Sequence, residues 1–196
     1  MLTQISDSFG SFSEQTEVYL KELVAGFSIT ASLVCDQNGN TVGKSGSSKE
    51  LGNQTDLALL IALRRKSQVI LTSGATFRAD QYRFPSNADL AVLTTGSIAM
   101  DVPVGQKLLV KKSGYLEALR ELSTEGYSRV HVEYGITGIR ELLASRSLDA
   151  LFLSSKSLTG LQTLASQLAV TATVYGLDDL YIGLVAWQPK LSTGSR

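Results

Sequence analysis

The sequence has few of the residues that build disulfides and metal sites. It contains one cysteine, Cys35, and one histidine, His131, among 196 residues. A single cysteine cannot form a disulfide within the chain, and with one histidine the chain lacks the ligands of a closed zinc site. We therefore expect no bound metal, and the cysteine usage favours an intracellular location in the cytoplasm.

The sequence also lacks an excess of charge and any long apolar run. Eighteen basic residues balance eighteen acidic ones, so no net field draws the chain to phosphate backbones or anionic lipid. No apolar stretch approaches the roughly 20 residues that span a bilayer, and the opening MLTQISDSFGSF lacks the pattern of a signal peptide. We expect neither nucleic acid nor a membrane as a partner.

What the chain has in quantity is apolar side chains, which make up 43% of it. A chain of this length buries roughly 70% of its unfolded surface when it folds around one core. We predict one domain over residues 1–196, with a helical segment in residues 1–26 and a flexible tail in residues 190–196. Two small domains would also fit the length.

Apolar periodicity predicts strands that alternate with helices. The first helix is expected over Glu14–Val24, capped by Ser13. Further helices are expected over residues 55–65, 115–126, 136–146 and 158–167, and strands over residues 27–34, 68–73, 90–94, 107–111, 129–133 and 149–154. A turn is expected at Asn38–Gly39, and the last apolar segment predicts an antiparallel hairpin with its loop around Gly176–Asp179.

The fold class that follows is α/β. We expect a mostly parallel central sheet of about eight strands, with helices on both faces and the C-terminal antiparallel hairpin at one edge. Ligands of such sheets bind beyond the carboxyl ends of the strands. The loops at those ends are therefore the places to search for a site.

Two loops at such carboxyl ends share one design. LTSGAT (residues 71–76) and VEYGIT (residues 132–137) each leave a buried strand, pass a glycine and enter a helix. Free backbone amides and the helix dipole at two such points can hold a pyrophosphate. The alternative is simple turn geometry, and neither loop has the three spaced glycines of an ordinary Rossmann fingerprint.

Glu133 ends the apolar strand before the second loop, where an unpaired carboxylate would be costly to bury. It is either a cap or ion-pair partner at the sheet edge, or a carboxylate that accepts hydrogen bonds from a polar substrate. His131 points to the same face of a regular strand, and a hydrogen-bonded core histidine is favoured over a catalytic one.

Basic residues at two places have a structural and a functional interpretation. Arg64, Arg65 and Lys66 end a buried helix, where they either meet solvent and the helix dipole or hold a substrate phosphate. Lys111 and Lys112 end a strand, where they are either solvated or lie near the 2′-phosphate of a nucleotide.

Together these segments resemble the reductase domain of the bacterial bifunctional riboflavin biosynthesis deaminase and reductase family, which has a dihydrofolate reductase-like fold. The similarity runs from about Ser28 to Leu153. ALRRKSQVILTSGATFRAD is similar to that family's helix, strand and loop ending in a Thr and an Asp. VHVEYGITGIRELLASRSLDALFL is similar to its Val-Glu-x-Gly segment with the following Leu-rich helix and strand.

The resemblance implies an oxidoreductase that uses NADPH to reduce 5-amino-6-(5-phosphoribosylamino)uracil, a small phosphoribosylamino-pyrimidine, to the ribitylamino product of riboflavin biosynthesis. Glu133 and Asp36 are the candidate catalytic carboxylates. The implied substrate-binding residues are Ser48, Arg64 and Glu133, with Arg64 on the substrate phosphate. The implied cofactor-binding residues are Thr30, Thr76, Asp80, Thr95, Gly135, Ile136, Thr137 and Gly138. A homodimer is also implied, with Tyr181, Leu184 and Trp187 as the suggested contacts.

The sequence departs from the family pattern at several places. Asp36 lies in a longer loop than the family's Ser-Leu-Asp-Gly, and Tyr134 replaces a small residue at the phosphate turn. Glu50 stands where relatives often carry an aromatic residue, and Arg83 is the nearest substitute for a basic residue beyond Asp80. A second hypothesis is therefore a non-catalytic or divergent relative that binds a nucleotide ligand or acts only in assembly.

Overall fold

The computed structural model describes residues 14–187 of the chain. Ser13, expected to cap the first helix, and the predicted tail at residues 190–196 lie outside the described residues. Between these limits the predicted order of helices and strands is confirmed. Where the bounds differ, they differ by one or two residues at the ends of elements.

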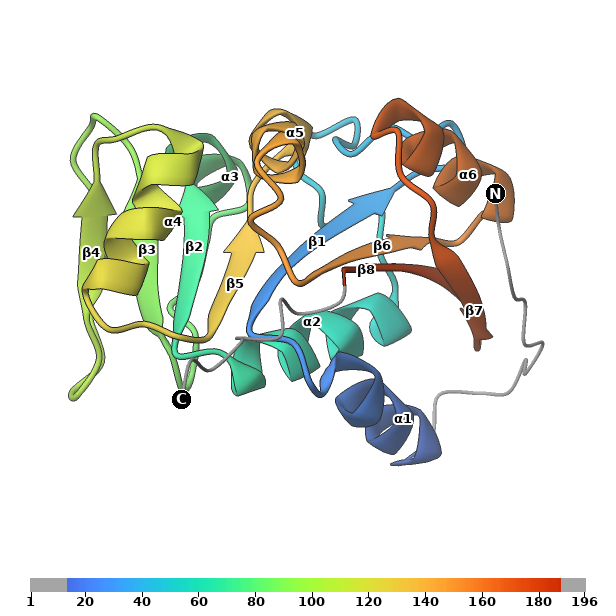
Figure 1. Ribbon diagram of the computed structural model, residues 1–196, viewed down its shortest axis with the longest axis horizontal. Coiled ribbons are helices and arrows are strands. Elements are labelled where there is room, and N and C mark those ends of the chain that lie inside the picture. Colours follow the sequence, from blue (N-terminus) through green and yellow to red (C-terminus); the bar gives the residue numbers. More distant parts are fainter. Residues whose placement is uncertain (1–13, 188–196) are drawn as a thin grey trace, which may run out of the picture.

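One sheet of eight strands organises the fold, in the order β4-β3-β2-β5-β1-β6-β8-β7. The strands are β1 (Ile29–Cys35), β2 (Val69–Ser73), β3 (Asp89–Leu93), β4 (Leu108–Lys111), β5 (Val130–Glu133), β6 (Ala150–Ser155), β7 (Thr173–Leu177) and β8 (Leu180–Ala186). β1 to β6 run parallel, so their carboxyl ends share one edge of the sheet, at the top of Figure 1. β8 runs antiparallel to both β6 and β7, which confirms the C-terminal hairpin.

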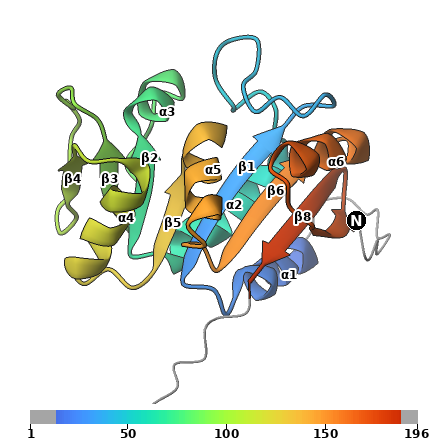
Figure 2. The ribbon, with the colours of Figure 1, turned by 45° about the horizontal axis from the view of Figure 1, so that its top comes forward.

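Helices cover both faces of this sheet. They are α1 (Glu14–Val24), α2 (Gln54–Lys66), α3 (Gly74–Ala79), α4 (Tyr115–Thr124), α5 (Ile136–Ala144) and α6 (Leu158–Gln167). α4, α5 and α6 lie on one face, and α2 lies on the other with α1 beside it (Figure 2). We call the face of the sheet that α2 covers the α2 face. The predicted α/β class, with a mostly parallel sheet between helices, is confirmed.

Alternation along the strands divides the side chains between the two faces. On β5, Val130 and Val132 join the core cluster that contains Leu142 of α5. His131 and Glu133, between and after them, therefore point to the α2 face. This alternation places the polar residues of a central strand under α2, and it decides on which face the candidate site lies.

β1 begins at Ile29, two residues later than the predicted strand. Phe27 instead packs in the core of the α2 face, where its ring meets Phe152 edge-on with centroids 6.2 Å apart. The amides of Ser28 and Ile29 both donate to the Asp149 carboxylate, at 2.9 Å each. The Asp149 side chain thus accepts hydrogen bonds from the amides at the start of β1.

The three residues suggested as dimer contacts do not form a free edge. Tyr181 and Leu184 lie in β8 and Trp187 follows it, and β8 is paired on both sides, so the free edge of the hairpin is β7. Tyr181 and Trp187 pack against the core cluster beside α5, and Leu184 packs against the core of the α2 face. These side chains belong to the packing of the fold.

Candidate active site at the carboxyl edge of the sheet

Two neighbouring strands bring the two glycine loops together. β2 and β5 pair in parallel, with Thr72 opposite Glu133. β2 continues through Gly74 into α3, and β5 continues through Gly135 into α5. The Thr72 hydroxyl also donates to the Glu133 carbonyl at 3.1 Å. The loops therefore leave the same edge side by side, as a joint phosphate site requires.

The two helix starts differ in how their amides are satisfied. At α3, the Ser73 hydroxyl accepts from the Thr76 amide at 3.1 Å and donates to the Thr76 hydroxyl at 3.0 Å. At α5, Gly135 is the N-cap, no side chain caps the helix, and a Cβ added at Gly135 would meet nothing within 4 Å. First-turn amides have no acceptor within their helix, so those of Ile136 and Thr137 are open donors for an anion.

Gly138, in the same turn of α5, has a packing role. A Cβ there would lie 2.8 Å from ring atoms of both Tyr115 and Tyr134. These two rings meet edge to face with centroids 4.8 Å apart, and Tyr134 is 2% exposed. The missing side chain at Gly138 thus makes room for the bulky residue at position 134. Tyr134 points into the core beside α4 and α5, on the opposite face from Glu133, and does not fill the space above the sheet.

Glu133 and Arg64 form the central ion pair of the site. Arg64, on α2, donates from Nε to Oε1 and from Nη2 to Oε2 of Glu133, both at 2.7 Å. The Tyr82 hydroxyl donates to Oε2 at 2.8 Å and accepts from Arg64 Nη2 at 2.9 Å. The ion-pair interpretation of Glu133 is confirmed, and its carboxylate has three donors from the protein itself.

Each member of the Arg64–Glu133 pair stabilises the ionised form of the other. Burial alone would raise the pKa of Glu133, but the hydrogen bonds and charge of Arg64 hold that pKa below its usual value. Burial likewise opposes the charge of Arg64, and Glu133 outweighs it and raises the pKa of the guanidinium. Both groups are therefore ionised at neutral pH. Tyr82 lies in QYRFPSN, where the sequence pattern directed attention to the exposed Arg83, and it is Tyr82 that reaches the site.

His131 is a hydrogen-bonded core histidine, as predicted. It is fully buried, with Nδ1 2.9 Å from the Thr30 hydroxyl and Nε2 3.1 Å from the Ser32 hydroxyl. Burial lowers the pKa of His131 to about 4, so the ring is neutral at ordinary pH. Thr30, expected at the cofactor, is 3% exposed and lies near the amino end of β1. The structure does not bring it to the carboxyl edge.

The loop between β1 and α2, residues 36–53, extends above the carboxyl ends (Figure 2). Asp80, at the end of α3, accepts from the Ser47 hydroxyl at 2.5 Å and from the amide and hydroxyl of Ser48 at 3.2 Å each. Ser48, expected at the substrate, and Asp80, expected at the cofactor, are thus brought together by a contact with each other. This contact ties the loop to α3.

Asp36 follows β1 directly and shapes the start of this loop. Its Oδ1 accepts from the amides of Asn38 and Asn40 at 2.8 and 2.9 Å, and its Oδ2 accepts from Asn40 Nδ2 at 2.9 Å. These hydrogen bonds, those of Asn40 first, lower the pKa of Asp36. Gly39 has a φ of 79°, which confirms the predicted turn. A carboxylate with a lowered pKa and several donors is poorly suited to give up a proton as a general acid.

Asp56, in the first turn of α2, is a better-placed carboxyl group that the motif analysis missed. Its Oδ1 accepts from the hydroxyl of Ser154, at the carboxyl end of β6, at 2.5 Å. A Cβ added at Gly52 would lie 2.2 Å from Oδ2, so a glycine makes room for the carboxyl group. Burial raises the pKa of Asp56, against the smaller effects of Ser154 and Lys156. Asp56 is thus suited to hold a proton.

A sequence signal for Asp56 exists. An acidic residue in the first turn of a helix is ordinary, because it complements the helix dipole. In TDLALLIAL, Thr55–Leu63, however, it is the only charge in an otherwise apolar segment that packs on the sheet. A lone charge in a buried segment is a candidate for function.

Of the two strand-end lysines, Lys111 differs from both expectations, whereas Lys112 is exposed. Lys111 is 6% exposed and its ammonium pairs with Glu121 at 3.4 Å and with Glu125. It is therefore neither a solvated strand end nor open to a nucleotide phosphate. Lys112 and Thr95 are exposed and follow the carboxyl ends of β4 and β3.

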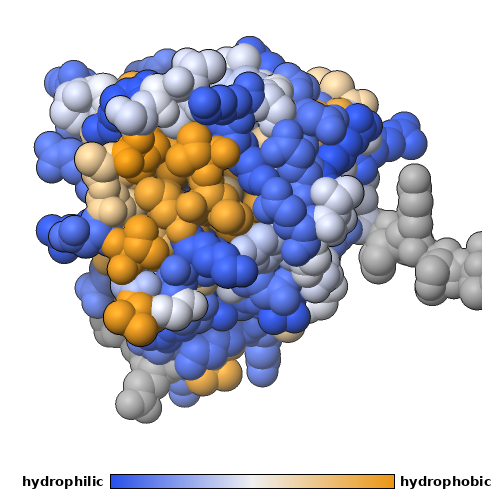
Figure 3. All heavy atoms as spheres, turned by 90° about the vertical axis from the view of Figure 1, so that its left-hand side faces the viewer, coloured by the Kyte–Doolittle hydropathy of each residue, from blue (hydrophilic) through white to orange (hydrophobic). Residues whose placement is uncertain are grey.

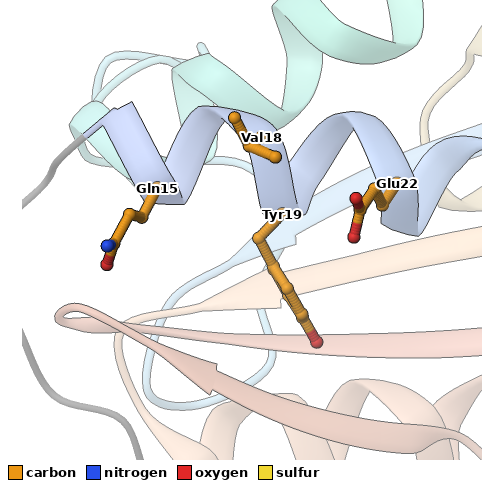
Figure 4. Close-up of a pocket in the computed structure, with 4 residues that line it drawn as sticks. All are labelled: Gln15, Val18, Tyr19 and Glu22. Atoms are coloured by element: carbon orange, nitrogen blue, oxygen red, sulfur yellow. The ribbon is translucent and has the colours of Figure 1, made fainter.

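Some surface hollows lie away from this edge. One of about 340 Å³ is lined by Gln15, Val18, Tyr19 and Glu22 of α1 (Figure 4). Another, of about 230 Å³, lies between α1 and α2. Figure 1 places α1 below the sheet, at the end opposite the carboxyl ends of the parallel strands. Neither hollow contains a residue of the candidate site.

Other chemistries find little support in the part of the chain that the structure describes. Within residues 14–187, no group of three or more His, Cys, Asp and Glu side chains is placed to hold a metal ion. No helix in that range has the length and apolar content to cross a membrane. Burial raises the pKa of Cys35 to about 11, so its thiol is protonated and a poor nucleophile.

Neither a family model nor a curated protein matches the sequence. Solved structures do match. A pyrimidine reductase-like protein from Corynebacterium diphtheriae superposes with a TM-score of 0.64 at 17% identity, covering 85% of this chain and 98% of its own. Dihydrofolate reductase from Enterococcus faecalis, solved with NADP(H), superposes with a TM-score of 0.50 at 16% identity, covering 80% and 95%. The fold is dihydrofolate reductase-like.

The same dihydrofolate reductase-like fold is shared with a bifunctional enzyme from Thermotoga maritima. That protein is a diaminohydroxyphosphoribosylaminopyrimidine deaminase and 5-amino-6-(5-phosphoribosylamino)uracil reductase, and it superposes with a TM-score of 0.56 at 16% identity. The match covers 87% of this chain and 59% of the Thermotoga chain. At these identities the comparison establishes the fold.

Proposed function

We propose that the chain is a cytoplasmic, NADPH-dependent pyrimidine reductase that reduces 5-amino-6-(5-phosphoribosylamino)uracil to the ribitylamino product. The observation that carries this proposal is the pairing of β2 with β5. It sets two glycine-led helix starts beside the Arg64–Glu133 pair at the edge where such sheets bind ligands. Neighbours of the same fold, a reductase of that pyrimidine and a dihydrofolate reductase with NADP(H), support the substrate class and the cofactor.

The carboxyl edge fits the phosphates of a dinucleotide. The uncapped first turn of α5 offers its amides to an anion, and Gly135 leaves the approach to them open. When bound, NADPH would supply the hydride for the reduction. The residues that we propose to hold it are Thr76, Asp80, Thr95, Gly135, Ile136, Thr137 and Gly138.

Arg64 keeps donors for a substrate phosphate even though it is paired with Glu133. A guanidinium has five N–H groups, one on Nε and two on each Nη. Glu133 takes the donor on Nε and one on Nη2, and Tyr82 takes the other on Nη2, which leaves both donors on Nη1. The ion pair fixes the plane of the guanidinium, and the side chain is 25% exposed. Ser48 is proposed as a second substrate contact, at the loop that Asp80 holds in place.

The reduction of a ribosylamine also needs a proton. As the sugar ring opens, the bond from its anomeric carbon to the ring oxygen breaks and that oxygen must take up a proton. The nitrogen lone pair forms a C=N bond to the same carbon, which gives a protonated imine that a hydride would reduce to the amine. We assign this proton to Asp56, because its Oδ1 accepts from Ser154 and its Oδ2 is left to carry it. A burial-raised pKa is the property that a general acid requires. Glu133, held ionised by Arg64, serves to position rather than to donate.

The proposal is tested by mixing the purified chain with NADPH and the deaminated pyrimidine and following the loss of NADPH absorbance. We expect turnover in the wild type and its loss in Arg64→Ala. Arg65→Ala is the matched control, because Arg65 is the exposed neighbour on the same helix. Calorimetry should show tighter binding of NADPH than of NADH, and equal affinities would contradict the choice of cofactor.

A second candidate is a relative of the same fold that binds a nucleotide but does not catalyse. Two observations favour it: Arg64 and Glu133 form hydrogen bonds to each other, and the Asp36 carboxylate accepts from amides of its own turn. Folded protein that binds NADPH and shows no turnover with the pyrimidine would select this candidate. The family resemblance supports a homodimer in either case.

A further inference from the structure

The edge of the sheet at β4 carries an exposed apolar surface. Val102 and Val104, in the loop before β4, are 43% and 105% exposed, and Val110 of β4 is 43% exposed. Figure 3 views the molecule from this side and shows hydrophobic residues gathered in one patch. We call Val102, Val104 and Val110 the β4 patch. Contiguous exposed apolar surface of this kind marks an interaction site.

The backbone of β4 is also open on its outer side. β4 ends the strand order, with β3 as its neighbour. The carbonyls of Lys107 and Lys111 accept from backbone amides on the β3 side, at 2.9 and 2.8 Å. Because successive residues of a strand direct their N–H and C=O groups to opposite sides, those of Leu108 and Val110 point away from β3. Such an edge is a template for another strand.

We propose that the β4 edge pairs with the β4 edge of a second copy of this chain. The two strands would run antiparallel about a two-fold axis at Leu109. In this register Leu108 lies opposite Val110 of the second copy, so the outward N–H of each residue finds the outward C=O of the other. One surface then serves both copies, which is the condition for a closed, symmetric dimer.

The side chains fit this register on the α2 face. Leu108 packs against a core cluster with Ile98 and Met100, which belong to the same loop as two residues of the β4 patch. Leu108 and Val110 share this face because alternate residues of a strand point the same way. Pairing the strands therefore brings the valines of one copy against Leu108 and the loop of the other, and removes the β4 patch from water.

On the other face the charges select a second copy over an unrelated strand. Lys111 pairs with Glu121 and Glu125, and two carboxylates against one ammonium leave one negative charge. Lys107 is exposed and lies on the same face as Lys111, two strand alternations away. In the proposed register Lys107 comes opposite Lys111 of the second copy, beside its two glutamates. Each copy thus supplies the positive charge that the other lacks.

Sedimentation equilibrium of the purified chain tests the surface. We expect a dimer, and Val110→Lys should raise its dissociation constant by roughly 100-fold, because two ammonium groups would leave water without a partner. Val18→Lys is the matched control, since Val18 is 54% exposed on α1, and it should leave the dissociation constant unchanged. A monomer at all concentrations, or a dimer that Val110→Lys does not weaken, would overturn the proposal.

Amide hydrogen exchange tests the register. The amides of Leu108 and Val110 should exchange slowly in the dimer and quickly when dilution or Val110→Lys separates the copies. The amides of Leu109 and Lys111, which face β3, should stay protected in both states. A dimer in which the amide of Leu108 exchanges at the rate of the monomer would exclude strand pairing. NADPH binding by Val110→Lys should equal that of the wild type, so this test is separate from the reductase proposal.

Discussion

Arg64 and Glu133, which are 69 positions apart in the sequence, face each other as a bidentate ion pair with both N–O distances at 2.7 Å. One partner lies on the helix that crosses the α2 face and the other at the end of a central strand. The pair therefore fixes where α2 sits over β5. It also orients a guanidinium at the edge where ligands of this fold class bind.

Glu133→Gln should destabilise the protein. The amide cannot neutralise Arg64, whose side chain is three-quarters buried and would keep an uncompensated charge. We expect the free energy of unfolding to fall by about 2–3 kcal/mol in urea denaturation. Glu117→Gln removes the carboxylate of an exposed pair with Arg120 and should change it by less than about 0.5 kcal/mol. Equal effects of the two substitutions would show that the Arg64–Glu133 pair contributes no more than a surface pair.

Stability should fall in mild acid because of His131. Its pKa is about 6.5 in the unfolded chain and about 4 in the folded one. Between these two pH values the unfolded chain binds more protons than the folded chain. The stabilising contribution of neutral His131 is therefore complete above the unfolded pKa and is lost as pH falls toward the folded pKa. The loss amounts to as much as about 3 kcal/mol.

At lower pH, two carboxyl groups change the stability of the protein in opposite directions. The lowered pKa of Glu133 adds a loss of stability as pH falls below its unfolded value. The raised pKa of Asp56 acts the other way, since its contribution is largest in acid and fades as pH rises through its folded pKa. Urea denaturation of wild type and His131→Gln, compared from about pH 7 to pH 5, isolates the histidine. The wild type should lose stability more steeply than His131→Gln, and parallel curves would contradict the assignment.

Local patterns in the sequence were sufficient to predict the elements and the fold class. Alternation and apolar runs mark β1 and β5 because a buried strand needs little beyond its own residues to be recognised. The predicted start of β1 is too early, because Phe27 is apolar for packing in the core of the α2 face rather than for strand pairing. The hairpin was predicted, but not that β8 lies inside the sheet, since strand order depends on contacts far apart in sequence.

The site was harder to predict because its chemistry depends on long-range pairing. Glu133 could be singled out as a costly carboxylate, but its partner could not be chosen among several cations without the fold. Lys111 was expected either in water or near a nucleotide phosphate, yet it is buried and pairs with Glu121 of α4 and with Glu125, which follows that helix. Asp36 was singled out by motif similarity, whereas its loop closes on neighbouring asparagines that the family pattern does not contain.

Two glycines in one helix start should respond differently to alanine. Gly138→Ala forces a Cβ to within 2.8 Å of two tyrosine rings and should cost about 1–3 kcal/mol in urea denaturation. Gly135 has a φ of −66°, and a Cβ added there meets open space, so Gly135→Ala should leave the stability of the protein unchanged. Its affinity for NADPH should fall by roughly 10-fold in calorimetry, because the methyl group blocks close approach to the α5 amides. Unchanged affinity in Gly135→Ala would place the phosphates elsewhere.

Asp56→Asn should separate proton donation from folding and binding. The amide oxygen can still accept from the Ser154 hydroxyl, so the fold and NADPH affinity should be retained. Loss of the acidic proton should lower kcat by roughly 100-fold or more with the deaminated pyrimidine. We expect the wild-type rate to decline at high pH as Asp56 ionises, and the residual rate of Asp56→Asn should lose this decline. Asp36→Asn is the matched control, because its carboxylate has a lowered pKa and serves a turn, and its pH profile should follow the wild type. If Asp36→Asn instead abolishes turnover while Asp56→Asn leaves it intact, Asp36 is the proton donor. Helix α2 then contributes Arg64 to the site but no general acid.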